Sequence, residues 1–288
     1  MTTPHDTTNR KPDDGATVLV LGATGKTGRR IAERLEAAGT RVRRGSRATA
    51  RPFDWHDEAT WDACLAGVQA AYISYAPDLA LPGATDAIAS LVDKAGRHGL
   101  ERLVLLSGRG EDEAQACERI VQRSGLQWTI VRASWFNQNF SEGAFAAMVQ
   151  AGRITLPDVT TPEPFVDADD IADVAAAALT QPGHAGEVYE LTGPRLLTLA
   201  EVAAEIGAAT GRRIQHAPVP HADFVQGITR SGAPKDVVWM LDYLFATVLD
   251  GRNAQVCDGV TRALGRPAKD FSVFAREVAA GGLWRVAA

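Results

Sequence analysis

The chain has 288 residues, of which 45% are hydrophobic and 23% are charged, and its formal net charge is -5. This composition excludes general disorder, and a negative net charge does not supply the positive field that nucleic-acid binding requires. No run approaches the roughly 20 apolar residues of a membrane span, so we expect a cytoplasmic protein without nucleic-acid or membrane partners.

The predicted elements begin after a polar leader. Residues 1–15 lack the apolar core of a signal peptide and are expected to be disordered. Apolar runs then alternate with amphipathic segments: strands are predicted over 16–22, 40–46, 70–76, 102–108 and 127–133, and helices over 26–39, 55–67, 84–99 and 113–125. This alternation predicts an α/β fold with a Rossmann-type, doubly wound parallel sheet.

The pattern changes after about residue 135. A helix over 167–181, a strand over 187–193 and a helix over 197–211 are predicted, and the chain from His221 onward reads as mainly helical. We expect the Rossmann domain to span 16–155 with parts of 160–195. Residues 196–288 are expected to form a smaller, mainly helical substrate-binding cap over the carboxyl ends of the strands, where such sheets bind ligands.

A glycine-rich turn, GATGKTG, joins the first strand to the first helix. Its first glycine permits the turn, the second lets the backbone approach a diphosphate, and the third lets the helix pack on the strand. The phosphate loop of ATPases requires a further glycine at position 20, where Val20 stands, so we predict a dinucleotide instead. The predicted contacts are Gly22, Thr24, Gly25, Lys26, Thr27 and Gly28.

The end of the second strand indicates which dinucleotide binds. Folds of this type that prefer NAD place Asp or Glu there, to hold the ribose hydroxyls. This chain has Arg43, Arg44, Gly45, Ser46 and Arg47 instead. A guanidinium and a hydroxyl suit a 2′-phosphate, so the predicted cofactor is NADP(H), with Ser46 and Arg47 as its contacts.

The sequence predicts neither a metal site nor a disulfide framework. Cys64, Cys117 and Cys257 lie far apart, and the six histidines show no ligand spacing.

Four segments together resemble the NmrA-like atypical short-chain dehydrogenase/reductases. They are GATGKTG, PFDW at 52–55, SWFNQNF at 134–140 and PFVDADDIADVAAAAL at 164–179. FDW and WFNQNF are most similar to the subgroup of festuclavine synthases, agroclavine dehydrogenases and their bacterial relatives. The resemblance implies that Asp54 and Trp55 lie against the adenine, and that Ala76 and Pro77 pass the nicotinamide ribose. It also implies that Trp135, Phe136 and Asn137 flank the nicotinamide and open onto the substrate.

The chain departs from the superfamily at its proton donor. Typical members carry Tyr-x-x-x-Lys on the helix that follows the strand bearing the active-site serine, whose place Ser107 takes here. That helix reads EDEAQACERIVQRSG and contains neither Tyr nor Lys. Ser107 is therefore expected either to bond a substrate oxygen or only the backbone, and Tyr75 either to replace the missing acid or to belong to the core.

Other aromatic and acidic residues also have more than one possible role. Trp239 and Tyr243, one helical turn apart, are expected either to line the cap side of the substrate pocket or to pack in the core. Acidic residues at 167, 169 and 170, and at 111–113, fit the starts of helices, where carboxylates cap and stabilise the helix dipole.

Without the acid pair, hydride transfer suits an acceptor that is already activated. We therefore expect an NADPH-dependent reductase of an imine or iminium, a quinone or a polyketide-type ketone in a small aromatic or heterocyclic natural product, acting as a monomer or homodimer. The alternative is a non-catalytic NADP(H) sensor of the NmrA type.

Overall fold

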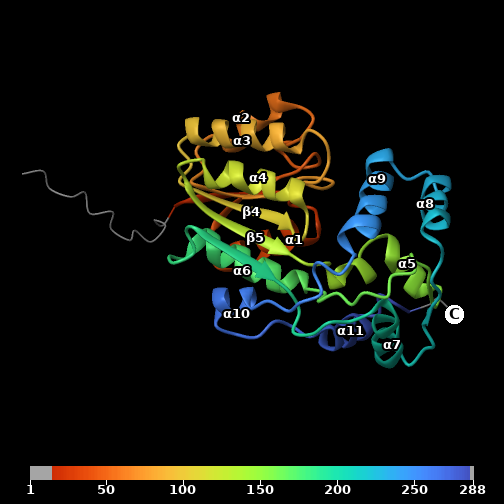
Figure 1. Cartoon of the computed structure of the whole chain (residues 1–288). Helices are drawn as coiled ribbons and strands as arrows, with labels where there is room; N and C mark the ends of the chain where they lie inside the picture. Colours follow the sequence, from red (N-terminus) through yellow and green to blue (C-terminus); the bar gives the residue numbers. More distant parts are fainter. Residues whose placement is uncertain (1–14, 286–288) are drawn as a thin grey trace, which may run out of the picture.

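Six parallel strands form the central sheet of the protein (Figure 1). The computed structural model describes residues 15–285, so the predicted leader lies outside the described residues except for Gly15. The strands follow the order β2-β1-β3-β4-β5-β7. Their bounds are β1 (Thr17–Leu21), β2 (Arg41–Gly45), β3 (Ala70–Ile73), β4 (Arg102–Gly108), β5 (Gln127–Ala133) and β7 (Glu187–Leu191).

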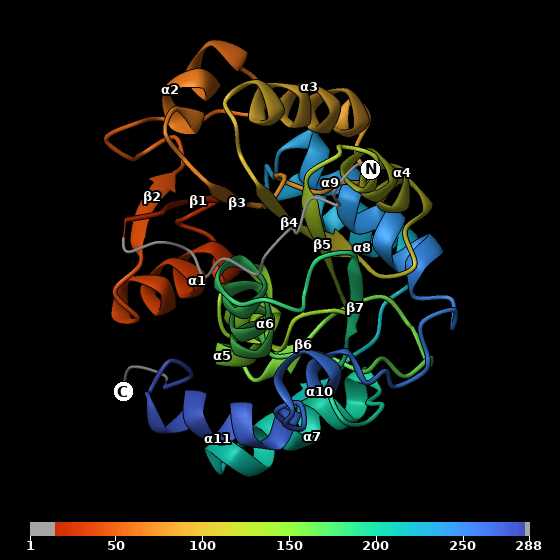
Figure 2. The same cartoon turned by 90° about the vertical axis from the view of Figure 1, so that its left-hand side faces the viewer.

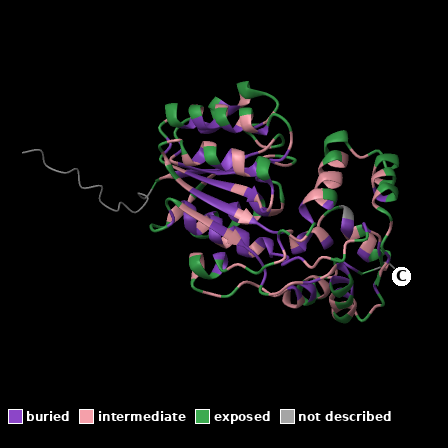
Figure 3. Cartoon of the chain, viewed as in Figure 1, coloured by how far each residue is buried: buried purple, intermediate pink, exposed green. Residues whose placement is uncertain are grey.

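Helices cover both faces of this sheet, as expected for strands that are apolar on both sides. One face packs on α2 (Trp61–Leu65), which follows the short helix η1 (Glu58–Thr60), and on α3 (Ala84–Arg97) and α4 (Asp112–Gln122). The other face packs on α1 (Lys26–Ala37) and α6 (Ala168–Thr180). Figure 3 shows the buried strands between helices whose outer sides are exposed. The predicted fold class is confirmed.

A second lobe lies beside the carboxyl ends of the strands (Figures 1 and 2). It has its own apolar core, in which α7 and α11 lie side by side. Its elements are η2 (Asn137–Phe140), α5 (Ala144–Gln150), β6 (Arg153–Ile154), α7 (Leu199–Thr210), β8 (Gln215–His216), α8 (His221–Arg230), α9 (Lys235–Tyr243), η3 (Leu244–Val248) and α11 (Phe271–Ala280).

The chain passes between the two lobes more than once. The sequence places residues 137–155 in the Rossmann domain, but Phe140, Phe145 and Ile154 belong to the core of the second lobe. Conversely, α10 (Gly259–Leu264) packs on β7 and α6. The second lobe is therefore built from segments that precede and follow β7 in the sequence.

The strand order reverses between β1 and β3. From β1 the chain runs to β2 at one edge and then to β3 on the opposite side of β1. Ligands of open α/β sheets bind in the crevice at such a switch point, outside the carboxyl ends of the strands. Directly after the edge strand β2, one isolated parallel bridge joins Ser46 to Pro52.

Candidate functional site

A cavity of about 930 Å³ lies at the switch point. It is lined by the β1–α1 turn, by the segments after β2, β3, β4 and β5, and by one side of α9. Its volume is at the upper end of that of ordinary small-molecule sites. The cavity thus joins the predicted phosphate turn to the second lobe.

The glycine-rich turn closes one end of this cavity. Gly22 has a φ of +68°, which suits glycine, and its carbonyl accepts a hydrogen bond from the Gly25 amide at 2.8 Å. A Cβ on Gly28 would overlap the Gly22 carbonyl oxygen, so α1 can pack this closely against the turn only because residue 28 is glycine. No side chain caps α1, whose first amides have no acceptor within the helix. The turn therefore fits a diphosphate.

Five of the six predicted turn residues line the cavity, and Gly28 lies beneath them. Lys26 connects the turn to the second lobe, because its Nζ donates to Oδ1 of Asn139 at 2.8 Å. Burial lowers the pKa of Lys26. The two motifs GKT and WFNQNF, far apart in the sequence, thus meet at the phosphate end of the site.

The basic residues after β2 have different partners. Arg43 donates to the carbonyls of Cys64 and Ala66, and Arg44 pairs with Glu36 at 2.7 Å. Arg47 and Ser46 instead line the cavity. The buried Ser46 Oγ has no hydrogen-bond partner among the described residues, so the site holds an unused hydroxyl where a 2′-phosphate is expected.

The predicted adenine and ribose contacts also line the cavity. Trp55 donates its Nε1 hydrogen to the Ser74 carbonyl at 3.2 Å and packs on Tyr75, with ring centroids 4.8 Å apart. Tyr75 is half-buried, and burial raises the pKa of its hydroxyl. Asp54, Ala76 and Pro77 complete this wall.

Ser107 lies at the end of β4 and faces the cavity, but its hydroxyl is engaged. Its Oγ donates to Glu118 at 2.6 Å, and Glu118 is also bound by Arg132 through Nε at 2.9 Å. With its hydrogen held by Glu118, Ser107 retains only acceptor capacity toward a ligand.

The segment after β5 is divided between cavity and core. Trp135 and Phe136 line the cavity. Asn137 is fully buried, and its side-chain Nδ2 donates to Oδ2 of Asp167 at 3.4 Å, so this side chain lies behind the wall. It is not among the cavity-lining residues.

The cap side of the cavity is one face of α9, and it does not include the predicted aromatic pair. Trp239 and Tyr243 stack on each other with ring planes 5° apart, and Tyr243 donates to Glu113 at 2.8 Å. The apolar lining residues of α9 and the first residue of η3 lie at i, i+3, i+4 and i+7, a pattern that the sequence contained. They are Val237, Met240, Leu241 and Leu244.

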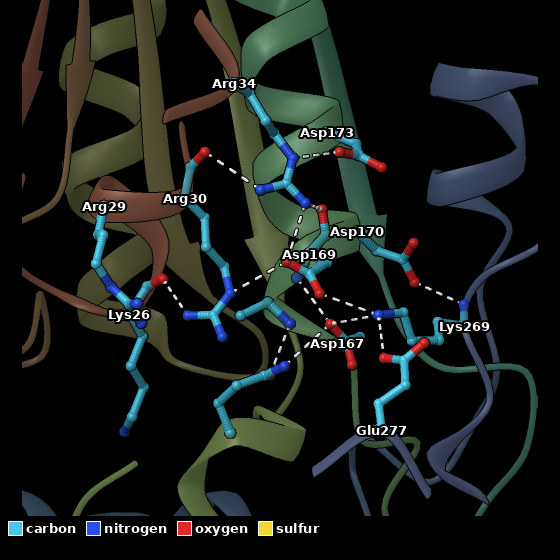
Figure 4. Close-up of polar contacts among 12 residues, drawn as sticks. Lys26, Arg29, Arg30, Arg34, Asp167, Asp169, Asp170, Asp173, Lys269 and Glu277 are labelled. Carbon is cyan, nitrogen blue, oxygen red and sulfur yellow. Dashed lines mark hydrogen bonds and ion pairs between the residues drawn. The ribbon is translucent and has the colours of Figure 1, made fainter. Parts of the chain in front are cut away.

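An ionic network fixes the position of α1 against α6 and the C-terminal segment (Figure 4). Asp169 binds Arg30 and Arg34 of α1 at 3.1 and 2.9 Å, and it binds Lys269 at 3.0 Å. These ion pairs lower the pKa of Asp169 to about 2. Asp167 caps α6 by accepting from the Asp169 amide at 2.8 Å, as predicted. The PFVDADD motif therefore holds the helix that carries the phosphate turn.

Three cavity-lining acids were not predicted as site residues from the sequence. Asp78 follows Pro77, Glu111 precedes α4 without capping it through its side chain, and Asp236 lies in the first turn of α9. For Glu111, the only sequence signal was an acidic run at a helix start, which ordinary capping explains equally well.

No cluster of three metal-ligating side chains occurs within residues 15–285. In the same range, no helix combines the length and the apolar character needed to cross a membrane.

Comparison with known proteins identifies the family. The NAD(P)H-binding family model matches residues 22–182, and the NmrA-like family model matches residues 112–262. The NAD(P)H azoreductase of Xenophilus azovorans is 30% identical over 91% of this chain and 98% of its own length. The agroclavine dehydrogenase of Claviceps fusiformis is 28% identical over 90% and 96%.

Among solved structures, the triphenylmethane reductase of Citrobacter sp. complexed with NADP(H) has the same fold. Its TM-score is 0.73 at 18% identity, and the match covers 91% of this chain and 99% of that chain. The predicted resemblance is therefore confirmed: the chain belongs to the NmrA-like family of NAD(P)H-binding proteins and is an oxidoreductase.

Proposed function

We propose that this protein is an NADPH-dependent reductase of an activated acceptor in a small aromatic or heterocyclic compound. The acceptor is an imine or iminium, a quinone or a polyketide-type ketone. The observation that carries the proposal is one cavity that runs from the phosphate turn to the apolar face of α9, beside a helix α4 without a Tyr–Lys pair. The names of the relatives, an azoreductase and an agroclavine dehydrogenase, agree with acceptors of this kind.

Different parts of the cavity bind different parts of the cofactor and the acceptor. The amides at the start of α1 bind the diphosphate, Ser46 and Arg47 bind the 2′-phosphate, and Trp55 lies against the adenine. Apolar side chains at the far end exclude water and hold a flat acceptor. They are Trp135, Phe136, the α9 residues Val237, Met240 and Leu241, and Leu244 of η3. When bound, the reduced nicotinamide supplies the hydride.

A panel of acceptors tests the activity. We expect loss of the near-ultraviolet absorbance of NADPH with at least one imine, iminium or quinone, because positioning suffices for acceptors that are already electrophilic. Tight NADPH binding without turnover of any acceptor would contradict the reductase and favour the sensor of the NmrA type.

Cofactor choice is tested at Arg47. Arg47→Ala is expected to weaken NADPH binding about tenfold, the effect of one charge-assisted hydrogen bond at an exposed position, and to leave NADH binding nearly unchanged. Arg44→Ala removes the same charge from a residue paired with Glu36 and is the matched control. Fluorescence titration measures both dissociation constants; equal losses for the two cofactors would refute this phosphate site.

A further inference from the structure

Two acidic residues of the cavity wall lie in the segments that follow β3 and β4. They are Asp78 and Glu111, and Glu111 is only 5% exposed. The Glu111 carboxyl lies so close to Gly108, the last residue of β4, that a Cβ there would overlap it. Its Oε2 has no hydrogen-bond partner among the residues that the structure describes.

The basic groups close to this pair are used elsewhere. Arg109, two residues before Glu111, donates to the Asn253 carbonyl at 2.8 Å and pairs with Glu190 at 3.2 Å. Arg252 donates to the Gly110 carbonyl, and it pairs with Asp250 at 2.8 Å. Neither guanidinium therefore neutralises Glu111.

The remaining titratable neighbours are acidic or neutral. On α4 they are Glu113, which accepts from the Tyr243 hydroxyl of α9, Glu118, which is bound to Arg132, and the neutral thiol of Cys117, whose pKa burial raises. Burial, and next the negative charge of Asp78, raise the pKa of Glu111 to about 9. Burial also raises the pKa of Asp78, which accepts a hydrogen bond from Glu111. At neutral pH the two carboxyl groups together therefore hold one proton, and this proton is on Glu111.

We propose that Glu111 is the proton donor of this reductase, with Asp78 holding its acidic hydrogen at the cavity wall. The proposal rests on the proposed function and extends it to acceptors that become anionic on reduction, such as quinones and neutral imines. A carboxylic acid kept neutral by burial and a like charge is an established way to donate a proton at neutral pH. Glu111 and Asp78 thereby take the place of the Tyr and Lys that donate the proton in typical short-chain dehydrogenase/reductases.

In the proposed step, the electrophilic atom of the acceptor gains a hydride from the reduced nicotinamide. The electron pair of the acceptor's π bond moves onto the acceptor's oxygen or nitrogen. That atom takes the proton from Glu111 as the Glu111 O–H bond breaks. The acceptor is reduced by two electrons, the nicotinamide is oxidised, and the Glu111 carboxylate regains its proton from water.

Glu111→Gln tests the donor with two acceptors. The turnover of 1,4-naphthoquinone is expected to fall at least about 100-fold, the usual contribution of a general acid. The turnover of an N-alkylated cyclic iminium, which needs no proton, is expected to change little, as is the dissociation constant of NADPH. Asp112→Asn is the matched control, because Asp112 is an exposed carboxylate of the next residue, outside the cavity.

The protonation itself is measured without turnover. In the cofactor-free protein, the infrared band of a protonated carboxyl is expected to disappear as the pH rises through about 9, and to be missing from Glu111→Gln. Quinone turnover of the wild type should fall over the same range. Asp78→Asn removes the like charge, so both transitions should move to lower pH.

Different outcomes test the donor role of Glu111 and the reductase activity separately. Wild-type quinone turnover in Glu111→Gln, an equal loss with the quinone and the iminium, or no infrared band from Glu111 would overturn the donor. A wild type that binds NADPH and reduces no acceptor would instead overturn the reductase, whatever the infrared spectra show.

Discussion

Gly28→Ala is expected to weaken NADPH binding by roughly 10- to 100-fold, which corresponds to the 1–3 kcal/mol typical of an overpacked contact. The reason is that the added methyl group would overlap the Gly22 carbonyl, which is backbone and cannot rotate aside. The turn must shift, and its amides then no longer converge on the diphosphate. Calorimetric titration with NADPH measures the loss.

Gly96→Ala provides the matched control for this substitution. Gly96 also lies inside a helix, α3, but no atom lies within 4 Å of a Cβ placed there. Alanine at this position should stabilise the protein by about 0.5–1 kcal/mol, through the greater helix propensity of alanine, and should leave NADPH binding unchanged. Equal NADPH affinity in Gly28→Ala and the wild type would contradict the close packing on which the phosphate site depends.

The sheet was predictable from the sequence because its strands are buried on both faces. The strands at 102–108 and 127–133 were predicted with the bounds that the structure shows. The strand predicted over 70–76 ends at Ile73 instead, because Ser74 and the residues after it leave the sheet to form the cavity wall. The strands β6 and β8 were missed, since two residues are too short for any periodicity.

The cavity wall was predictable where a motif or the family resemblance defines positions along the chain. Most of the turn residues, Ser46 and the segments at 54–55, 76–77 and 135–136 line the cavity. The direction of a helical side chain depends on tertiary packing, so the face of α9 and the position of Asn137 did not follow from spacing alone. The role of Glu111 was not predictable for a similar reason. A carboxylate that caps a helix and one that enters a cavity beside the helix occupy the same position in the sequence.

Glu118→Ala is expected to destabilise the protein by about 3 kcal/mol, the cost of removing one partner from a buried ion pair. Glu118 is 2% exposed and connects α4 to the sheet, because it binds Arg132 on β5 and accepts from Ser107 on β4. Its loss would leave the half-buried Arg132 with Glu190 alone and the Ser107 hydroxyl without its acceptor. Arg132 cannot escape this cost by losing its proton, because a guanidinium remains protonated in proteins.

The same substitution at Glu187 separates burial from charge. Glu187 also pairs with an arginine, Arg262, but their side chains are 38% and 45% exposed. Glu187→Ala should therefore cost no more than about 1 kcal/mol, as exposed ion pairs do. Denaturant unfolding measures both free energies. Equal stability of the two variants would contradict this account. The contacts of Glu118 with Ser107 and Arg132 would then not be what holds α4 against the end of the sheet.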